Sequence, residues 1–224
     1  MYISAVSREE MGPKLLQEIA AYRYQVFVRT LGWQLDCPVG CELDQFDHAE
    51  AHYLLLREDS GALAGCARLL PTLQPYLLQQ VFPMLAPGLL PHDAAVWELS
   101  RFAVLSPALF GASQRTAVAE ESAKLRRPTT DRPRSALPQF SSEQAVALLQ
   151  AALDHARRLG ARSLVTVSPV GIDRLLSMAG FNTRALAPPQ TVGGHRLFAC
   201  QIECQGRQVL RLPASSRLPS AQAA

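Results

Sequence analysis

The chain contains 224 residues, of which 48% are hydrophobic, so it can bury one sizeable core. Lys and Arg number 22 against 19 Asp and Glu, and this small basic excess does not indicate nucleic-acid binding. The N-terminus shows no signal-peptide pattern, and no apolar run reaches the roughly 18 residues of a membrane span. We therefore expect a cytoplasmic protein without membrane insertion, with a single domain over residues 1–205 and a disordered tail over residues 206–224.

The first predicted helix carries a charge on its apolar face. A short strand at residues 2–6 leads into a helix at residues 13–30, where apolar side chains recur at helical spacing. Arg23 falls on this face, four residues before Phe27. Because an unpaired guanidinium is seldom left buried, Arg23 either snorkels to solvent or meets an anion.

An acidic loop follows this helix. The helical periodicity ends at Gly32 and Trp33, and turn residues and carboxylates alternate after that point. A solvated loop is one interpretation. The apolar residues Trp33, Leu43 and Phe46 lie among the acids and favour the other, a loop that folds down over a ligand. The acidic residues of the loop are Asp36, Glu42, Asp44 and Asp47.

A hairpin comes next. Residues 51–57 and 62–70 are apolar runs on either side of an Asp-Ser-Gly turn, with Arg68 near the end of the second run. The stretch at 71–91 is punctuated by prolines, and we expect irregular structure with one short helix at 76–81.

Residues 94–105 have the pattern of a buried strand that is interrupted by charge. Strict alternation places Glu98 and Ser100 on one face and Arg101 on the other, unless a bulge re-aims one of them. A carboxylate and an arginine inside such a strand are costly unless they pair or bind something. A structural salt bridge and a functional site are both open here, and perturbed charges in a core favour the site.

The second half of the chain completes an α/β pattern. Residues 106–140 are a basic, proline-rich excursion, and the arginines here and after it predict a patch for an acidic partner. The order of helices and strands predicts a three-layer α/β fold with a mixed sheet. The remaining elements are a helix at 141–159, a strand at 163–168, a helix at 171–179, and strands at 181–187 and 195–204; the patch arginines are Arg126, Arg127, Arg132, Arg134, Arg157, Arg158 and Arg162.

Several common sites are missing from the sequence. It contains no Gly-x-Gly-x-x-Gly or Walker loop, and no serine or cysteine in a nucleophile elbow. The five histidines form no metal-ligand spacing. Cys200 and Cys204 lie in a predicted strand, where their sulfurs would be roughly 13 Å apart, so we predict free thiols and no metal site.

One set of separated motifs resembles a known family. The motifs are R-x3-F-x5-W, then E-L-D-x-F-D, then C-A-R-L-L, then W-E-L-S-R-F, and they span roughly residues 20–105. In this order and spacing they resemble the acyl-homoserine-lactone synthases, the LuxI-type autoinducer synthases of quorum sensing. The residues that carry the resemblance are Arg23, Phe27, Trp33, Asp44, Asp47, Arg68, Phe82, Glu98, Ser100 and Arg101.

The resemblance implies a fold similar to the N-acetyltransferases and a reaction between S-adenosylmethionine and an acylated acyl carrier protein. The acyl group passes to the methionine amine, and the carboxylate then attacks its own γ-carbon, which closes the lactone and expels methylthioadenosine. S-adenosylmethionine is a substrate here, so no cofactor is implied. The implied catalytic residues are Glu98, as the base, with Arg68, Asp44 and Asp47; those implied for S-adenosylmethionine are Arg23, Phe27, Trp33, Phe82, Ser100, Arg101 and Phe102.

The resemblance also implies a third and a fourth group of residues. Thr166 would meet the acyl chain, and Arg174, with Arg157 and Arg158, would dock the acidic carrier protein. The sequence departs from the family mainly in the insertion at 122–141. Two alternatives stay open: an acyl-coenzyme-A N-acyltransferase of the same general fold, which would need a Q/R-x-x-G-x-G/A turn that the sequence lacks, and a non-catalytic interaction module.

Overall fold

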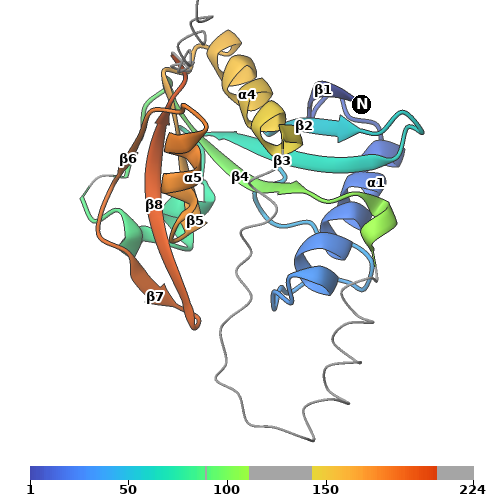
Figure 1. Ribbon diagram of the computed structural model, residues 1–224, viewed down its shortest axis with the longest axis horizontal. Coiled ribbons are helices and arrows are strands. Elements are labelled where there is room, and N and C mark those ends of the chain that lie inside the picture. The colour runs from blue at the N-terminus through green and yellow to red at the C-terminus, as the bar shows by residue number, and fades with distance from the viewer. Residues whose placement is uncertain (89, 111–142, 206–224) are drawn as a thin grey trace, which may run out of the picture.

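The computed structural model describes residues 1–88, 90–110 and 143–205, and Figure 1 shows their arrangement. The strands form one mixed sheet in the order β1-β2-β3-β4-β5-β8-β6, with β7 paired to β8. Neighbouring strands are antiparallel except for β4 and β5, which are parallel. The strands are β1 (Tyr2–Ser7), β2 (His52–Arg57), β3 (Leu63–Pro71), β4 (Val96–Val104), β5 (Ser163–Pro169), β6 (Thr183–Ala185), β7 (Gln190–Val192) and β8 (His195–Glu203).

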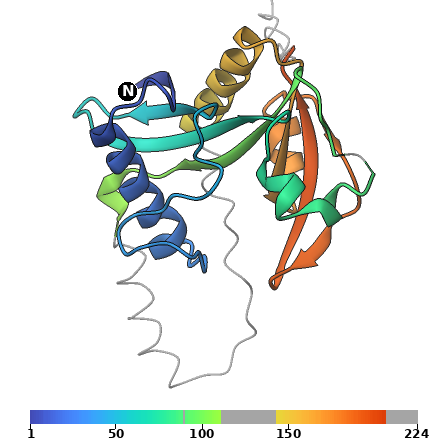
Figure 2. The same cartoon turned by 180° about the vertical axis from the view of Figure 1, so that it is seen from behind.

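Helices cover both faces of the sheet, as the predicted three-layer fold requires. One apolar cluster lies between the sheet and the helices α4 and α5, and a second lies on the face that carries α1. Figures 1 and 2 show α4 on one side of strands β2 and β3 and α1 on the other. The helices are α1 (Pro13–Arg23), α2 (Leu77–Gln80), α4 (Glu143–Arg158) and α5 (Ile172–Met178).

The sheet divides where β4 and β5 part. The register between the two strands ends at the pair Glu98 and Val165, although β4 continues to Val104 and β5 to Pro169. Beyond that pair the two halves of the sheet run in different directions, β1 to β4 on one side and β5, β8 and β6 on the other (Figure 1). Glu98 therefore lies at the point of divergence.

The predicted helix at residues 13–30 is present, but its second half is wider than an α-helix. After α1, residues Tyr24–Thr30 form a π-helical segment, in which Val26 and Phe27 are buried. Such segments are uncommon and occur frequently at functional sites. The segment leads directly to Trp33, whose N–H donates to the Phe27 carbonyl at 2.9 Å.

Strand β4 contains a bulge, the exception to strict alternation that the sequence pattern left open. Arg68 pairs with Ser100 and Cys66 with Ala103, so two residues of β4, Arg101 and Phe102, face the single residue between them on β3. Arg101 has φ 50° and is the one non-glycine residue with positive φ in the described ranges. The bulge turns Arg101 toward the α1 side, where Ser100 also lies, and Phe102 packs in the cluster under α4.

The other element predictions agree with the structure, with one strand missed. The hairpin, the short helix near 76–81 and the closing strands are all present, whereas β7 was not predicted. The helix start near residue 141, most of the basic excursion, the arginines from Arg126 to Arg134 and the tail at 206–224 lie outside the described residues. In the described ranges, no helix has the length and apolar character needed to cross a membrane.

Candidate active site

Three arginines and three carboxylates form one buried network beside the divergence of β4 and β5. Arg23 ends α1, Arg68 lies in β3 and Arg101 in the bulge of β4. The carboxylates all come from the loop between the π-helical segment and β2. Three positive charges thus meet three negative ones, and the members on the carboxylate side are Glu42, Asp44 and Asp47.

Each carboxylate bridges at least two arginines. Asp47 Oδ1 accepts from Nη1 of Arg23 at 2.7 Å and from Nη1 of Arg68 at 2.9 Å. Asp44 Oδ2 lies 2.7 Å from Nη2 of Arg101, and its Oδ1 accepts from Arg68.

Glu42 completes the network. Its Oε2 accepts from Nε of Arg23, and its Oε1 accepts from Nε and Nη2 of Arg101 at 3.1 and 2.9 Å. The arginines therefore pair with the loop acids. Arg23 is fully buried and does not snorkel to solvent.

Backbone hydrogen bonds hold the acidic loop on the protein. The N–H of Glu42 donates to the carbonyl of Ala20 at 3.1 Å, which ties the loop to α1. Asp44 and Asp47 close the turn between them, since Asp47 Oδ2 accepts from the Asp44 N–H at 2.8 Å and Asp44 Oδ1 accepts from the Phe46 N–H at 2.9 Å. The solvated-loop interpretation is therefore wrong for these three acids, whereas Asp36 is exposed and takes no part in the network.

Ion pairing in the network shifts the pKa values of Asp47 and Arg23. Burial by itself raises the pKa of Asp47, but Arg23 and Arg68 outweigh burial and hold that pKa well below its usual range. Burial likewise lowers the pKa of Arg23, and the carboxylates of Asp47 and Glu42 reverse this and raise it. Mutual attraction thus keeps Asp47 and Arg23 ionised inside the protein.

Glu98 stands apart from the network and has the opposite character. Its carboxylate accepts from the backbone N–H groups of Leu77 and Leu78, at 2.9 and 2.6 Å, and makes no ion pair with Arg68 or Arg101 in the part of the chain that the structure describes. Its exposed fraction is 1%. Burial raises its pKa to about 7, against the smaller lowering effect of the two N–H groups and of the nearby arginines. Glu98 is thus the group here that gains or loses a proton near neutral pH.

The implied aromatic residues occupy two faces of the sheet. Trp33 stacks on Phe27 with ring centroids 4.8 Å apart, and the guanidinium of Arg101 lies 5.7 Å from the Phe27 centroid. Phe82 packs against the apolar cluster on the α1 face of the sheet, to which Phe27 also belongs. Phe27 is 2% exposed and Trp33 39%, so Trp33 is the more accessible of the two rings. Phe102 packs under α4, away from these rings.

The residues implied for the acyl chain and the carrier protein lie elsewhere on the fold. Thr166 follows the last β4–β5 pair directly and is buried, and it pairs with Cys200, a member of the cluster under α4. Arg174 is exposed on α5. Arg157 and Arg158 are exposed in the last turn of α4, where Arg157 pairs with Asp154 at 3.3 Å.

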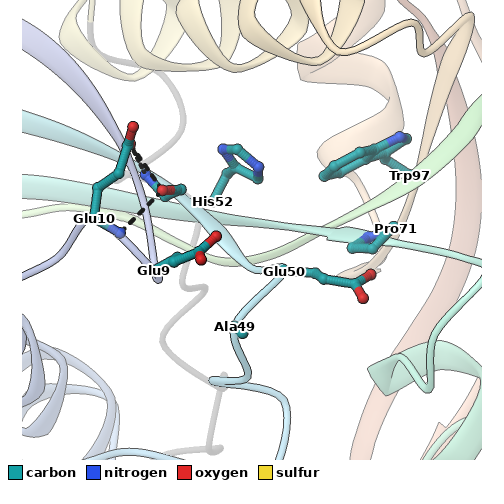
Figure 3. A pocket seen from close by; sticks show the side chains of 8 residues that line it. Glu9, Glu10, Ala49, Glu50, His52, Pro71 and Trp97 are labelled. Atoms are coloured by element: carbon teal, nitrogen blue, oxygen red, sulfur yellow. Dashed lines mark hydrogen bonds between the residues drawn. The ribbon is translucent and has the colours of Figure 1, made fainter.

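A separate pocket of about 470 Å³ opens at another part of the sheet (Figure 3). Its glutamates include Glu10, which accepts from the Ser7 hydroxyl at 2.8 Å, and His52 meets Trp97 edge-on at 5.6 Å. No member of the charge network lines it, so we place the site at the network. Its lining residues are Ser7, Glu9, Glu10, Ala49, Glu50, His52, Pro71 and Trp97.

Two members of the site were missed as site residues. Glu42 was noted only as one of the loop acids, although E-L-D-x-F-D contains it. Tyr53 donates its hydroxyl to Asp47 Oδ1 at 2.6 Å and is buried in β2. Nothing in the apolar run of β2 distinguishes Tyr53 from a core residue, whereas the position of Glu42 in the motif was a usable signal.

Comparison with known sequences agrees with this geometry. A family model described as "Autoinducer synthase" matches residues 7–125. An acyl-homoserine-lactone synthase of Acinetobacter nosocomialis is 39% identical over 204 residues, which cover 91% of this chain and 100% of that protein. The corresponding protein of Acinetobacter baumannii is 37% identical over 205 residues and is also covered to 100%.

Solved structures extend the similarity to three dimensions. The crystal structure of TofI in a ternary complex with an inhibitor and MTA has a TM-score of 0.71 and 32% identity, and covers 92% of this chain and 94% of that one. MesI, a CoA-dependent acyl-homoserine lactone synthase, has a TM-score of 0.68 and 26% identity over 92% and 90%. An acyl-CoA N-acyltransferase from Pseudomonas aeruginosa, at 15% identity, TM-score 0.53 and 89% and 97% coverage, shares the fold alone and confirms the predicted likeness to N-acetyltransferases. The resemblance seen in the motifs is confirmed, and the chain belongs to the autoinducer synthase family.

Proposed function

We propose that the chain transfers an acyl group from an acylated acyl carrier protein to the amine of S-adenosylmethionine and then closes the lactone, giving an N-acyl-homoserine lactone and methylthioadenosine. One observation carries this proposal: a buried carboxylate with a pKa near 7, Glu98, lies where β4 and β5 diverge and beside the charge network. The similarity to TofI, whose structure contains MTA, supports the choice of substrate.

S-adenosylmethionine would bind where the network reaches the surface. The exposed fractions of the side chains are 18% for Asp44 and 8% for Arg101, against 5% or less for the other four members. Asp44 would attract the ammonium and Arg101 the carboxylate. The ring of Trp33 suits the sulfonium by cation–π attraction.

The proton of the amine would pass to Glu98. An α-ammonium group has a pKa of roughly 8, so most of it is protonated at neutral pH and cannot attack. A base is most effective when its own pKa lies near the working pH, and burial places Glu98 there. The freed nitrogen then forms a bond to the thioester carbonyl carbon, the carbon–sulfur bond breaks, and the leaving thiolate takes up the second proton that the nitrogen releases.

Lactone closure needs orientation rather than a second base. The carboxylate oxygen bonds to the γ-carbon while the bond from that carbon to the sulfonium breaks, and the electron pair leaves with sulfur as a neutral thioether. A carboxylate held in line with this bond gains a large effective concentration. The acyl tail would lie between the sheet and α4, where Phe102 and Thr166 flank the diverging strands.

The identity of the acyl donor is the finer part of the proposal. The sequence lacks the Q/R-x-x-G-x-G/A turn that binds a coenzyme-A pyrophosphate, and the exposed Arg157, Arg158 and Arg174 suit an acidic carrier protein. MesI shows that a similar protein is CoA-dependent, so coenzyme-A thioesters are the second candidate.

Purified protein tests both parts. With S-adenosylmethionine and an acyl carrier protein thioester, mass spectrometry should detect an acyl-homoserine lactone and an equal amount of methylthioadenosine. A higher kcat/KM for the matched coenzyme-A thioester than for the carrier thioester would show that the acyl donor is a coenzyme-A thioester and not the acylated carrier protein. Failure to form the lactone from either series of thioesters would refute the function.

A further inference from the structure

Arg101 adopts a backbone conformation that its side chain does not favour. Its φ of 50° lies in the left-handed region, where a Cβ crowds the neighbouring carbonyl. Non-glycine residues stay in this region when surrounding contacts hold them there, and such positions concentrate at functional sites. The contacts that hold Arg101 therefore determine where its guanidinium lies.

Glu42 supplies two of these contacts. Its Oε1 accepts from both Nε and Nη2 of Arg101, at 3.1 and 2.9 Å, and the guanidinium then lies 5.7 Å from the centroid of Phe27. Glu42 is itself fixed at its other oxygen by Nε of Arg23 and at its backbone N–H by the carbonyl of Ala20. A carboxylate anchored at both ends cannot follow its partner if Arg101 moves.

One edge of the guanidinium is left available by this arrangement. Nε and Nη2 of Arg101 are occupied by Glu42 and Asp44, whereas Nη1 has no hydrogen-bond partner within the described ranges. The side chain of Arg101 is 8% exposed and that of Glu42 is 1% exposed. Arg101 thus reaches the surface, and Glu42 lies behind it.

We propose that Glu42 is a positioning residue: it holds Arg101 in the bulge so that Nη1 receives the carboxylate of S-adenosylmethionine. The proposal rests on the function proposed above and adds a residue to it. Glu42 touches no substrate, so its loss should weaken binding of S-adenosylmethionine and leave the acyl donor unaffected. Because the sulfonium and ammonium contacts do not depend on Glu42, the bound amine should still be acylated, whereas lactone closure, which needs the carboxylate in line, should slow.

Glu42→Gln tests this with a change of shape smaller than one methylene. The amide retains one acceptor oxygen but turns an NH₂ group toward a guanidinium, so Arg23 or Arg101 loses its bond. KM for S-adenosylmethionine should rise about tenfold or more, with the single-turnover rate of acylation and KM for the acyl donor within about threefold of wild type. Glu42→Asp keeps the charge but not the reach to both arginines, so its KM for S-adenosylmethionine should lie between those of wild type and Glu42→Gln.

Glu18→Gln is the matched control, because Glu18 also forms a two-bond ion pair, with Arg57 at 2.6 and 2.7 Å, outside the network. An equal change of KM in both variants overturns the proposal, as does a lower melting temperature of Glu42→Gln with an unchanged KM. If Glu42→Gln does not fold, Glu42→Asp decides in the same way. Wild-type protein that forms no lactone would instead refute the proposed function.

Discussion

Replacing Glu98 by glutamine separates a catalytic base from a structural carboxylate. The carboxylate accepts one backbone N–H at each oxygen, from Leu77 and Leu78, and is 1% exposed. A glutamine retains one acceptor and presents an NH₂ group to the other N–H, which costs about 1–3 kcal/mol at every pH. It also removes the proton that Glu98 exchanges. The two effects are distinguished by their dependence on pH.

The magnitude follows from the pKa. Burial raises the pKa of Glu98 from 4.5 to about 7. A group whose pKa is raised on folding stabilises the protein below its unfolded pKa, and this stability is lost as the pH rises through the folded pKa. At about 1.36 kcal/mol per pKa unit, the free energy of unfolding of wild type should fall relative to Glu98→Gln by about 3 kcal/mol between about pH 4.5 and pH 8.

Urea denaturation of both proteins across this pH range measures that difference directly. Glu18→Gln is a control of opposite sign, because hydrogen bonding to Arg57 lowers the pKa of Glu18. The stability that ionised Glu18 gives the folded protein is therefore lost as the pH falls. If the difference in the free energy of unfolding between wild type and Glu98→Gln did not change with pH, the raised pKa of Glu98 would be refuted.

The same variant tests catalysis. If Glu98 accepts the proton of the amine, kcat should fall about 100-fold or more near neutral pH and recover above about pH 8, where the amine deprotonates unaided. Single-turnover acylation at several pH values, below the melting temperature of the variant, measures this rate. A variant that acylates at the wild-type rate when folded would show that Glu98 is only structural.

Three further outcomes are expected. Arg174→Glu should raise KM for the acylated carrier several-fold and leave KM for S-adenosylmethionine unchanged, and Arg184→Glu, at another exposed arginine, should change neither. We expect the Thr166 hydroxyl to donate a hydrogen bond to the 3-oxygen of a 3-oxo-acyl chain, so Thr166→Val should lower the ratio of 3-oxo to unsubstituted product about fivefold, since one neutral hydrogen bond is worth about 1 kcal/mol; an unchanged ratio in competition assays would exclude this contact. The free energy of unfolding of Arg101→Gly should exceed that of Arg101→Ala by about 1 kcal/mol, because only alanine retains the strain at φ 50°, and equal urea midpoints would contradict the strain.

The sequence predicted the charges of the site better than their partners. Arg23 on an apolar helix face and Arg68 in an apolar strand are costly if unpaired, and this cost is visible without a structure. The pairing itself depends on how the loop at residues 31–51 folds back on α1, through contacts such as the N–H of Glu42 on Ala20. Those contacts join residues distant in the chain, and no local pattern encodes them.

The position of Arg101 shows the same limit at a single residue. Strict alternation placed it on the α4 face, and only the register shift between β3 and β4 turns it to the side of Glu42. A bulge depends on pairing with the neighbouring strand, and β4 contains no glycine that would indicate one. The fold class could be predicted because the order of helices and strands leaves few topologies.

A network of six buried charges is a poor way to stabilise a fold. Each ion loses its hydration, and apolar residues of equal volume often hold a protein together as well or better. The network instead fixes directions: Asp44 and Arg101 are its most exposed side chains, and the four buried members hold them from behind. Each of the three carboxylates is paired with arginines, so the network contains no carboxylate without a cationic partner. The mechanism that we propose therefore takes its base from outside the network, and the structure offers Glu98, held by backbone N–H groups where the strands diverge.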